Sequence, residues 1–159
     1  MNTRSERGFT LVEVLIVGII ITLMAAVALP RMDFVFSRNK LRTSTNTISS
    51  TLYVARMKAV NDGVDYGVQF LETGEIHVLR DPNGDAVEAG PANRLEDDVS
   101  FAENNFINQT AVFTSFGQLD KYCLPEGEMT GTIILTSVDG DSTRVDVSLV
   151  TGRIRETNL

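Results

Sequence analysis

The feature that most constrains the fold is a nearly uninterrupted apolar run at residues 9–29, which follows eight mostly polar residues. As a helix rising about 1.5 Å per residue, the run would extend roughly 30 Å and could cross the hydrocarbon core of a bilayer. A secretory signal peptide has a shorter apolar core with a small-residue cleavage site after it. Here the small residue, Gly8, comes before the run. Cleavage at Gly8 would leave the helix on the mature chain, so the segment is predicted to be both targeting signal and anchor.

One acidic residue, Glu13, interrupts the apolar run. A carboxylate inside a membrane helix is costly and usually has a function. The alternative is a simple membrane anchor whose glutamate lies close enough to the helix end to reach the surface.

The sequence GFTLVE at residues 8–13 resembles the processing site of the type IV prepilin family, and Pro30 resembles the helix-kinking proline that commonly follows it. The resemblance implies that a prepilin peptidase cuts between Gly8 and Phe9 and methylates the new amine of Phe9. It also implies that Glu13 pairs with the N-terminal amine of a neighbouring subunit, and a partner charge is what makes a buried carboxylate tolerable.

The charged residues beside the apolar run do not decide which end of the predicted membrane helix faces the cytoplasm, because arginines lie on both sides of the run. The resemblance implies that the chain crosses the bacterial inner membrane once. The C-terminal part of the chain, the head, would lie in the periplasm and later in a filament. It also implies three partners: the inner membrane, the prepilin peptidase, and other pilins or pseudopilins. The other pilins or pseudopilins would contact the N-terminal helix.

A second helix is predicted for residues 31–62. Its apolar residues repeat at intervals of seven and four, as on one face of an amphipathic helix, and they are Phe34, Leu41, Ile48, Leu52, Ala55 and Ala59. Pro30 should bend the helix rather than end it, and Gly63 suits a left-handed cap at its end. We expect the second half of the stripe to pack on the sheet that follows; a coiled-coil seam is the alternative.

From residue 63 onward the apolar period changes to two, which is typical of strands. Strands are predicted at residues 64–71, 76–79, 112–116, 132–138, 144–150 and 152–155. Asp139-Gly140 predicts a tight hairpin, and the acidic stretch at residues 86–98 is predicted to be a long loop.

Three stretches of the second part resemble the GspH/FimT branch of minor pilins and pseudopilins. They are a Leu-x-x-Ala-Arg-x-x-Ala-type stretch at residues 52–60, Phe-x-x-x-Gly at 113–117 and a Gly-Arg strand at 150–155. Asn61-Asp62-Gly63 departs from the Arg-Asn usual after the first stretch. The resemblance implies an α+β fold, with a long N-terminal helix packed on a C-terminal antiparallel β-sandwich. The predicted division is a leader at 1–8, a transmembrane part at 9–30, a periplasmic amphipathic helix at 31–62 and a β-rich head at 63–159.

The composition argues against an enzyme and against a cofactor or metal site. The single histidine, His77, and the single cysteine, Cys123, make histidine-based catalysis and cysteine-rich metal centres improbable. Asp81, Asn83 and Asp85 start like a calcium loop, but the glycine and glutamate that such a loop needs later are both alanine here. We interpret this segment as a solvated turn.

The C-terminal Gly-Arg-x-Arg resembles the basic motif of family members that bind DNA during natural transformation. Arg153 and Arg155 would project to the same side of a strand and could contact two phosphates. From residue 62 to the end, however, 18 acidic residues face 6 basic ones, and a DNA site normally needs a larger basic patch. An edge strand kept soluble by its charges is the favoured interpretation.

Three functions remain open on the sequence. The first is a structural minor pilin or pseudopilin of a type IV pilus or a type II secretion system, and the second is a DNA-binding minor pilin for DNA uptake. The third is an unrelated membrane-anchored periplasmic domain.

Overall fold

The computed structural model describes residues 9–28 and 30–159, with side chains for 9–26 and 37–159. It divides into two compact units, Met1–Phe36 and Ser37–Leu159. The predicted leader, residues 1–8, lies outside the described residues. Because the division falls within the second helix, that helix contributes to both units.

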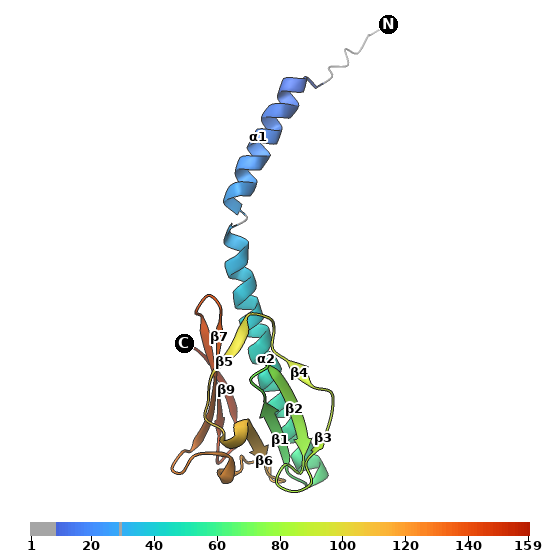
Figure 1. Ribbon diagram of the computed structural model, residues 1–159, viewed down its shortest axis with the longest axis vertical. Coiled ribbons are helices and arrows are strands. Elements are labelled where there is room, and N and C mark those ends of the chain that lie inside the picture. The colour runs from blue at the N-terminus through green and yellow to red at the C-terminus, as the bar shows by residue number, and fades with distance from the viewer. Residues whose placement is uncertain (1–8, 29) are drawn as a thin grey trace. The chain divides into compact units, whose positions relative to one another are not determined.

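Helix α1, Leu11–Ala28, comprises 18 residues and belongs to the first unit (Figure 1). It begins after Thr10, whose side-chain oxygen accepts a hydrogen bond from the Glu13 backbone N–H at 3.3 Å, as an N-cap residue does. By length and hydropathy, none of the helices in the described part of the chain qualifies as a membrane span. The membrane-spanning helix predicted for residues 9–30 is therefore not confirmed.

Helix α2, Pro30–Asp62, comprises 33 residues. Proline is well tolerated as the first residue of a helix, because its missing N–H would have no partner there. The bend predicted at Pro30 involves Leu29, which is outside the described residues, so it stays a prediction. The predicted end is confirmed, since Gly63 has a φ of 66° and its N–H donates to the Ala59 carbonyl at 3.1 Å.

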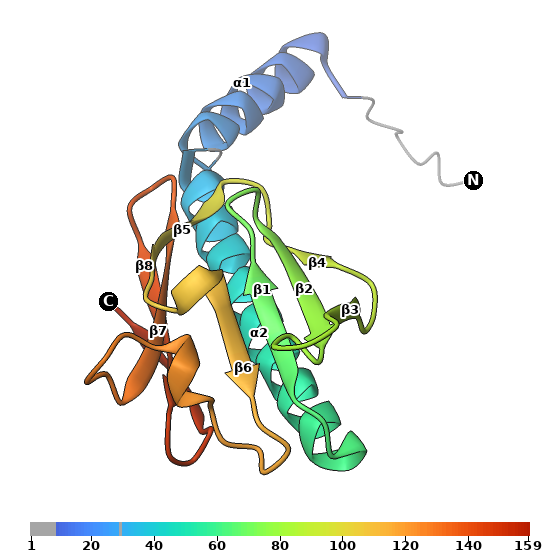
Figure 2. The same ribbon diagram turned by 60° about the horizontal axis from the view of Figure 1, so that its bottom comes forward.

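The predicted apolar stripe of α2 packs into the head. All five of its members with described side chains are at most 5% exposed, and they belong to one core cluster with residues of both sheets: Leu41, Ile48, Leu52, Ala55 and Ala59. Phe34, the sixth predicted member, is outside the residues with described side chains. The packing interpretation is confirmed for the second half of the stripe, and Figure 2 shows α2 running alongside the strands of the head.

The head contains two antiparallel sheets. The first has the order β3-β2-β1-β6, with β4 also paired to β2, and the second has the order β5-β7-β8-β9. The first sheet is built from β1 Tyr66–Phe70, β2 Glu75–Arg80, β3 Val87–Glu88, β4 Asn93–Arg94 and β6 Thr110–Phe113. The second is built from β5 Val99–Asn104, β7 Thr130–Ser137, β8 Ser142–Ser148 and β9 Ile154–Asn158. Two short 3₁₀ helices, η1 Ile107–Gln109 and η2 Lys121–Cys123, flank β6 along the chain. The predicted α+β fold is thus confirmed.

Several predicted strand boundaries were wrong. The stretch at 86–98 is not wholly loop, because β3 and β4 lie within it, and β5 was not predicted at all. Strand β6 ends at Phe113, before the predicted end at residue 116, because residues 114–117 form a turn closed by a hydrogen bond from the Gly117 N–H to the Thr114 carbonyl. The tight turn at Asp139-Gly140 is confirmed, with Gly140 at a φ of 89°.

Candidate assembly site and head surface

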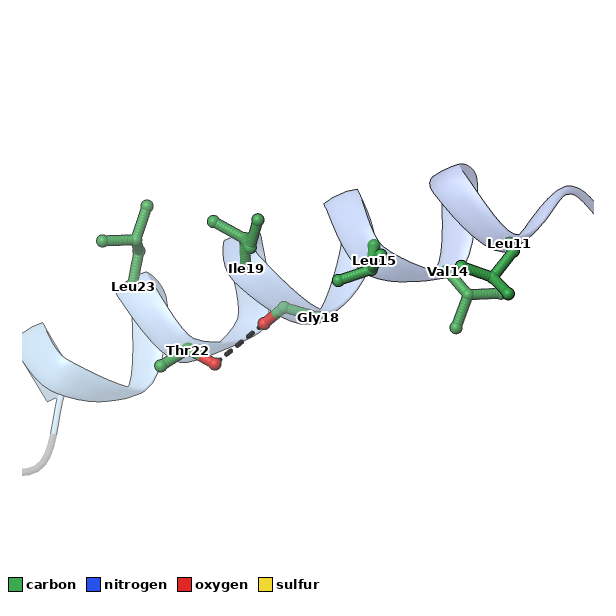
Figure 3. A pocket seen from close by; sticks show the side chains of 7 residues that line it. All are labelled: Leu11, Val14, Leu15, Gly18, Ile19, Thr22 and Leu23. Atoms are coloured by element: carbon green, nitrogen blue, oxygen red, sulfur yellow. Dashed lines mark hydrogen bonds between the residues drawn. The ribbon is translucent and has the colours of Figure 1, made fainter.

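Helix α1 is the first candidate site, because its large apolar side chains are exposed over the described residues 11–24. From Leu11 to Met24 every large apolar side chain is about half exposed or more. One face of the helix is lined by Leu11, Val14, Leu15, Gly18, Ile19, Thr22 and Leu23 (Figure 3).

This face has a shallow hollow at Gly18, where an added Cβ would meet no atom within 4 Å. The Thr22 hydroxyl donates to the Gly18 carbonyl at 2.8 Å, so its polarity is satisfied within the helix (Figure 3). Small residues of this kind allow the backbones of apolar helices to approach closely. The face is therefore suited to packing against another apolar helix.

The residues predicted to be processed lie at the start of this region. Phe9 precedes α1 and is 81% exposed, whereas Gly8 is outside the described residues. Glu13 is exposed in the first turn, where a carboxylate interacts favourably with the helix dipole. The cleavage, the methylation and the Glu13 pairing remain predictions.

A second candidate region is centred on Arg56 of α2, which joins two distant loops. Its Nε donates to the Gly117 carbonyl at 2.8 Å and its Nη2 donates to the Thr151 carbonyl at 2.9 Å. Gly152 packs so closely that an added Cβ would lie 2.2 Å from the Gly117 oxygen. We call Arg56, Gly117, Thr151 and Gly152 the Arg56 junction. It brings together the three stretches that carry the GspH/FimT resemblance, and their contact could not be predicted from the motifs alone.

Exposed apolar side chains occur on each of the three segments that meet at the Arg56 junction. On α2, residues 53, 57 and 60 recur at intervals of four and three and so share one face with Arg56. Phe116 directly precedes Gly117, and Val150 directly precedes Thr151. We call these five residues the junction patch, and their exposed fractions are Tyr53 47%, Met57 61%, Val60 52%, Phe116 86% and Val150 57%.

Arg153 directly follows Gly152 of the junction and precedes β9, and Arg155 is the second residue of β9. Strand β9 is an edge of the second sheet, as the favoured interpretation expected. Both arginines are exposed, and Arg155 is the pairing partner of the acidic Asp146 on β8. The next residue, Glu156, is acidic as well. Arg56 approaches the turn that precedes Arg153, but its guanidinium donates to the Gly117 and Thr151 carbonyls. No finding supports DNA binding.

The single histidine and the single cysteine, His77 and Cys123, both lie within packed parts of the head. His77 lies on β2 between the buried Ile76 and Val78, and its Nδ1 is 3.0 Å from Glu88 Oε1. Burial raises the pKa of the Cys123 thiol to about 11, and its Sγ donates to the Asp120 carbonyl at 2.8 Å. A thiol of this kind is largely protonated at neutral pH and is a poor nucleophile. Within the described residues, no group of three or more His, Cys, Asp or Glu side chains could hold a metal ion.

Solved structures with a similar fold include a minor pseudopilin and a minor pilin. The minor pseudopilin EpsH of the type 2 secretion system of Vibrio cholerae superposes with a TM-score of 0.57 at 14% identity, over 75% of this chain and 97% of that one. The type IV minor pilin FimU of Pseudomonas aeruginosa superposes in one crystal form with a TM-score of 0.56 at 18% identity, over 76% and 90% of the two chains. In a second crystal form its TM-score is 0.55 at 17% identity, over 74% and 92%. At these identities the likeness concerns the fold alone.

Family models match both parts of the chain. The prokaryotic N-terminal methylation motif matches residues 3–29, and the model of the type II transport protein GspH matches residues 44–152, well over half of the chain. No curated protein matches. The prepilin resemblance is thereby confirmed for the N-terminus and the GspH/FimT resemblance for the head. The chain belongs to the family of the type II transport protein GspH and is a minor pilin or pseudopilin.

Proposed function

We propose that this minor pilin or pseudopilin is cut between Gly8 and Phe9 by a prepilin peptidase, which then methylates the Phe9 amine. It is held in the bacterial inner membrane by one pass, with its head in the periplasm, until it joins a type IV pilus or a type II secretion pseudopilus. It acts as a structural subunit and not as an enzyme. The observation that carries the proposal is the exposed apolar surface of α1 at residues 11–24, in a chain whose N-terminus matches the methylation motif.

Assembly in this proposal follows from the chemistry of α1. Apolar side chains along the helix pack against those of neighbouring subunits, and the hollow at Gly18 permits close approach. Glu13 is the only acidic or basic residue in the sequence of α1; the other residues are apolar or uncharged. Its carboxylate would be poorly solvated in a helix bundle, so it favours the position at which a neighbour's methylated amine, which is positively charged, lies opposite. Glu13 thereby sets the axial position of each subunit.

The test of this proposal is the intact mass of the full chain, recovered from cells with and without a prepilin peptidase. We expect the loss of residues 1–8 and the gain of one methyl group, both dependent on the peptidase. Tandem mass spectrometry should place the methyl group on Phe9. A chain that stays uncut in both strains would contradict the proposal and favour an unrelated membrane-anchored domain.

A further inference from the structure

The first sheet of the head carries a cleft of about 510 Å³ that neither the processing nor the packing of α1 uses. Its floor includes Gln69 of β1, Leu79 of β2 and Thr110 of β6, on the face of the sheet turned away from the core. Its walls come from the segment between β2 and β3, from η1 and from η2. We call it the outer cleft. Its volume lies within the roughly 300–1,000 Å³ typical of small-molecule sites.

A glycine in β1 allows one wall to pack directly on the sheet. An added Cβ at Gly67 would lie 3.1 Å from the Pro82 Cβ and 3.2 Å from the Thr110 Cγ2, and both of these residues line the cleft. The segment after β2 is thereby held against the floor. The outer cleft is therefore formed by packing within one unit of the chain.

The acidic side chains of the outer cleft already have partners. Asp120 accepts hydrogen bonds from the Tyr122 backbone N–H at 3.0 Å and from Asn83 Nδ2 at 3.3 Å. Glu88 Oε1 lies 3.0 Å from His77 Nδ1. Among the described residues that line the cleft, none is a lysine, an arginine or a histidine. An anionic ligand would thus meet two carboxylates and no lining cation.

Charged residues beside the lining do not change this balance. The Lys121 Nζ lies 4.7 Å from the centre of the Tyr122 ring. On the segment after β2, the acidic Asp81 and Asp85 are both exposed. One positive charge and two negative charges therefore lie next to the cleft, and they do not make it attractive to an anion.

The polar groups that remain without a partner are neutral. Within the described part of the chain, no hydrogen bond engages the side-chain amides of Gln69 and Asn108 or the Tyr122 hydroxyl. Gln69 pairs with Thr110 in the sheet, two residues after Asn108, so both amides belong to the same part of the lining. A primary amide offers a donor and an acceptor side by side, and a hydroxyl offers both on one atom.

The backbone holds Asn108 in an unfavourable conformation. Asn108 and Gln109 both have a φ of 53°, in the left-handed region. Two hydrogen bonds fix this turn, from the Gln109 N–H to the Phe106 carbonyl at 3.0 Å and from the Thr110 hydroxyl to the Asn108 carbonyl at 2.9 Å. Backbone strain of this kind persists where the surrounding structure enforces it, and it gathers at binding sites.

We propose that the outer cleft binds a neutral sugar. Adjacent sugar hydroxyls each donate and accept, so they match the Gln69 and Asn108 amides. The apolar face of the sugar ring would lie against the apolar part of the lining, which includes Leu79, Pro82 and Ile107. This binding goes beyond the proposed function and does not depend on processing or assembly.

A glycan array tests the proposal with the full chain, purified in a detergent that has no sugar headgroup. The array carries neutral oligosaccharides of hexoses and N-acetylhexosamines, with sialylated and sulfated glycans as the acidic comparison. Sugars that bind are measured again in solution by calorimetry, beside amidated arginine as a cationic probe. We expect binding of neutral sugars only. A site filled by a monosaccharide fits a free sugar, whereas a need for several linked units fits a surface glycan.

Substitutions of the lining test the assignment of residues. Asn108→Gly removes one amide and tolerates the left-handed backbone, so it should weaken binding about tenfold without unfolding the head. Ala86→Trp keeps both amides but fills the cleft from an exposed position of its lining, and it should abolish binding. The matched control is Gln118→Ala, which removes an exposed amide outside the cleft and should bind as the wild type does.

Three results would overturn the sugar site. They are no binding to any neutral sugar, binding only to acidic glycans or to amidated arginine, and unchanged affinity in both Asn108→Gly and Ala86→Trp. Urea unfolding of each variant shows whether the fold is kept. Because binding is measured on purified protein, its failure would leave the proposed processing and assembly in place.

Discussion

At the scale of the residue, Gly152 has two separate reasons to be glycine. Its φ of 60° lies in the left-handed region, and an added Cβ would lie 2.2 Å from the Gly117 carbonyl oxygen. We expect Gly152→Ala to lower the free energy of unfolding by about 2–5 kcal/mol, from the left-handed backbone and from overpacking together. Urea unfolding of the full chain in detergent measures this loss.

A substitution at a second glycine separates the backbone contribution from the overpacking contribution to the lost free energy of unfolding. Gly127 has a φ of 90°, but an added Cβ there would meet no atom within 4 Å. Gly127→Ala should therefore cost only the backbone contribution, about 1–2 kcal/mol. Equal losses for the two substitutions would mean that the close approach of Gly152 to Gly117 does not matter.

Glu13 is the residue on which the proposed assembly depends. Replacing it with glutamine keeps the shape of the side chain but removes the charge that pairs with a neighbour's amine. We expect Glu13→Gln to abolish incorporation into filaments while leaving cleavage at Gly8 intact. Sheared filament fractions report incorporation, and intact mass reports cleavage.

Leu11→Ile is the matched control for Glu13→Gln, since it changes an exposed apolar residue of the same helix without changing charge. It should assemble as the wild type does. Normal incorporation of the Glu13→Gln chain would show that the carboxylate does not set the axial position.

At the scale of the element, the buried and exposed faces of α2 should respond differently to truncation. Leu52 is fully buried, whereas Met57 on the same helix is 61% exposed. Leu52→Ala should lower the free energy of unfolding by about 2–5 kcal/mol because it leaves a cavity. Met57→Ala should change it by no more than about 0.5 kcal/mol. Urea unfolding of the two variants measures both values, and similar losses would contradict the assigned faces.

The elements that could be predicted from the sequence are those with a regular apolar period and a clear stop. The stripe of α2 repeats over several turns and ends at Gly63, and β7 alternates between buried and half-buried residues along its whole length. Strand β5 has no such regularity, because its pairing with β7 shifts between Phe101 and Glu103. Strands β3 and β4 have two residues each, too few to show a period.

At the scale of the whole molecule, the charge of the head argues against DNA binding. The 18 acidic and 6 basic residues from position 62 onward repel a polyanion at long range. We expect no binding of labelled duplex DNA by the full chain at physiological salt, measured by fluorescence polarisation. Arg153→Ala with Arg155→Ala should leave this result unchanged. Salt-dependent binding that the double substitution removes would instead support the DNA-uptake alternative.

The two candidate regions differ in how far the sequence could predict them. The processing region is continuous in sequence, so residues 8–13 were enough to suggest it. The Arg56 junction joins residues 56, 117 and 152, which approach one another only when α2 packs against both sheets. Each of the three motifs around these residues is recognisable by itself. Their contact is not, because any residue can supply the backbone carbonyl that accepts a hydrogen bond from Arg56.

The attachment of α2 to the head also has a mechanical consequence. Near its start within the head unit, Arg38 and Lys40 form ion pairs with Asp141 and Asp98, at 3.0 and 2.6 Å. Near its end, Arg56 is bonded to two loops, and the buried stripe lies between these attachments. A pulling force along the helix would load both attachments and the stripe in shear, simultaneously. Contacts loaded together rupture at a higher force than contacts that peel one after another, so the head should resist extraction from a filament under tension.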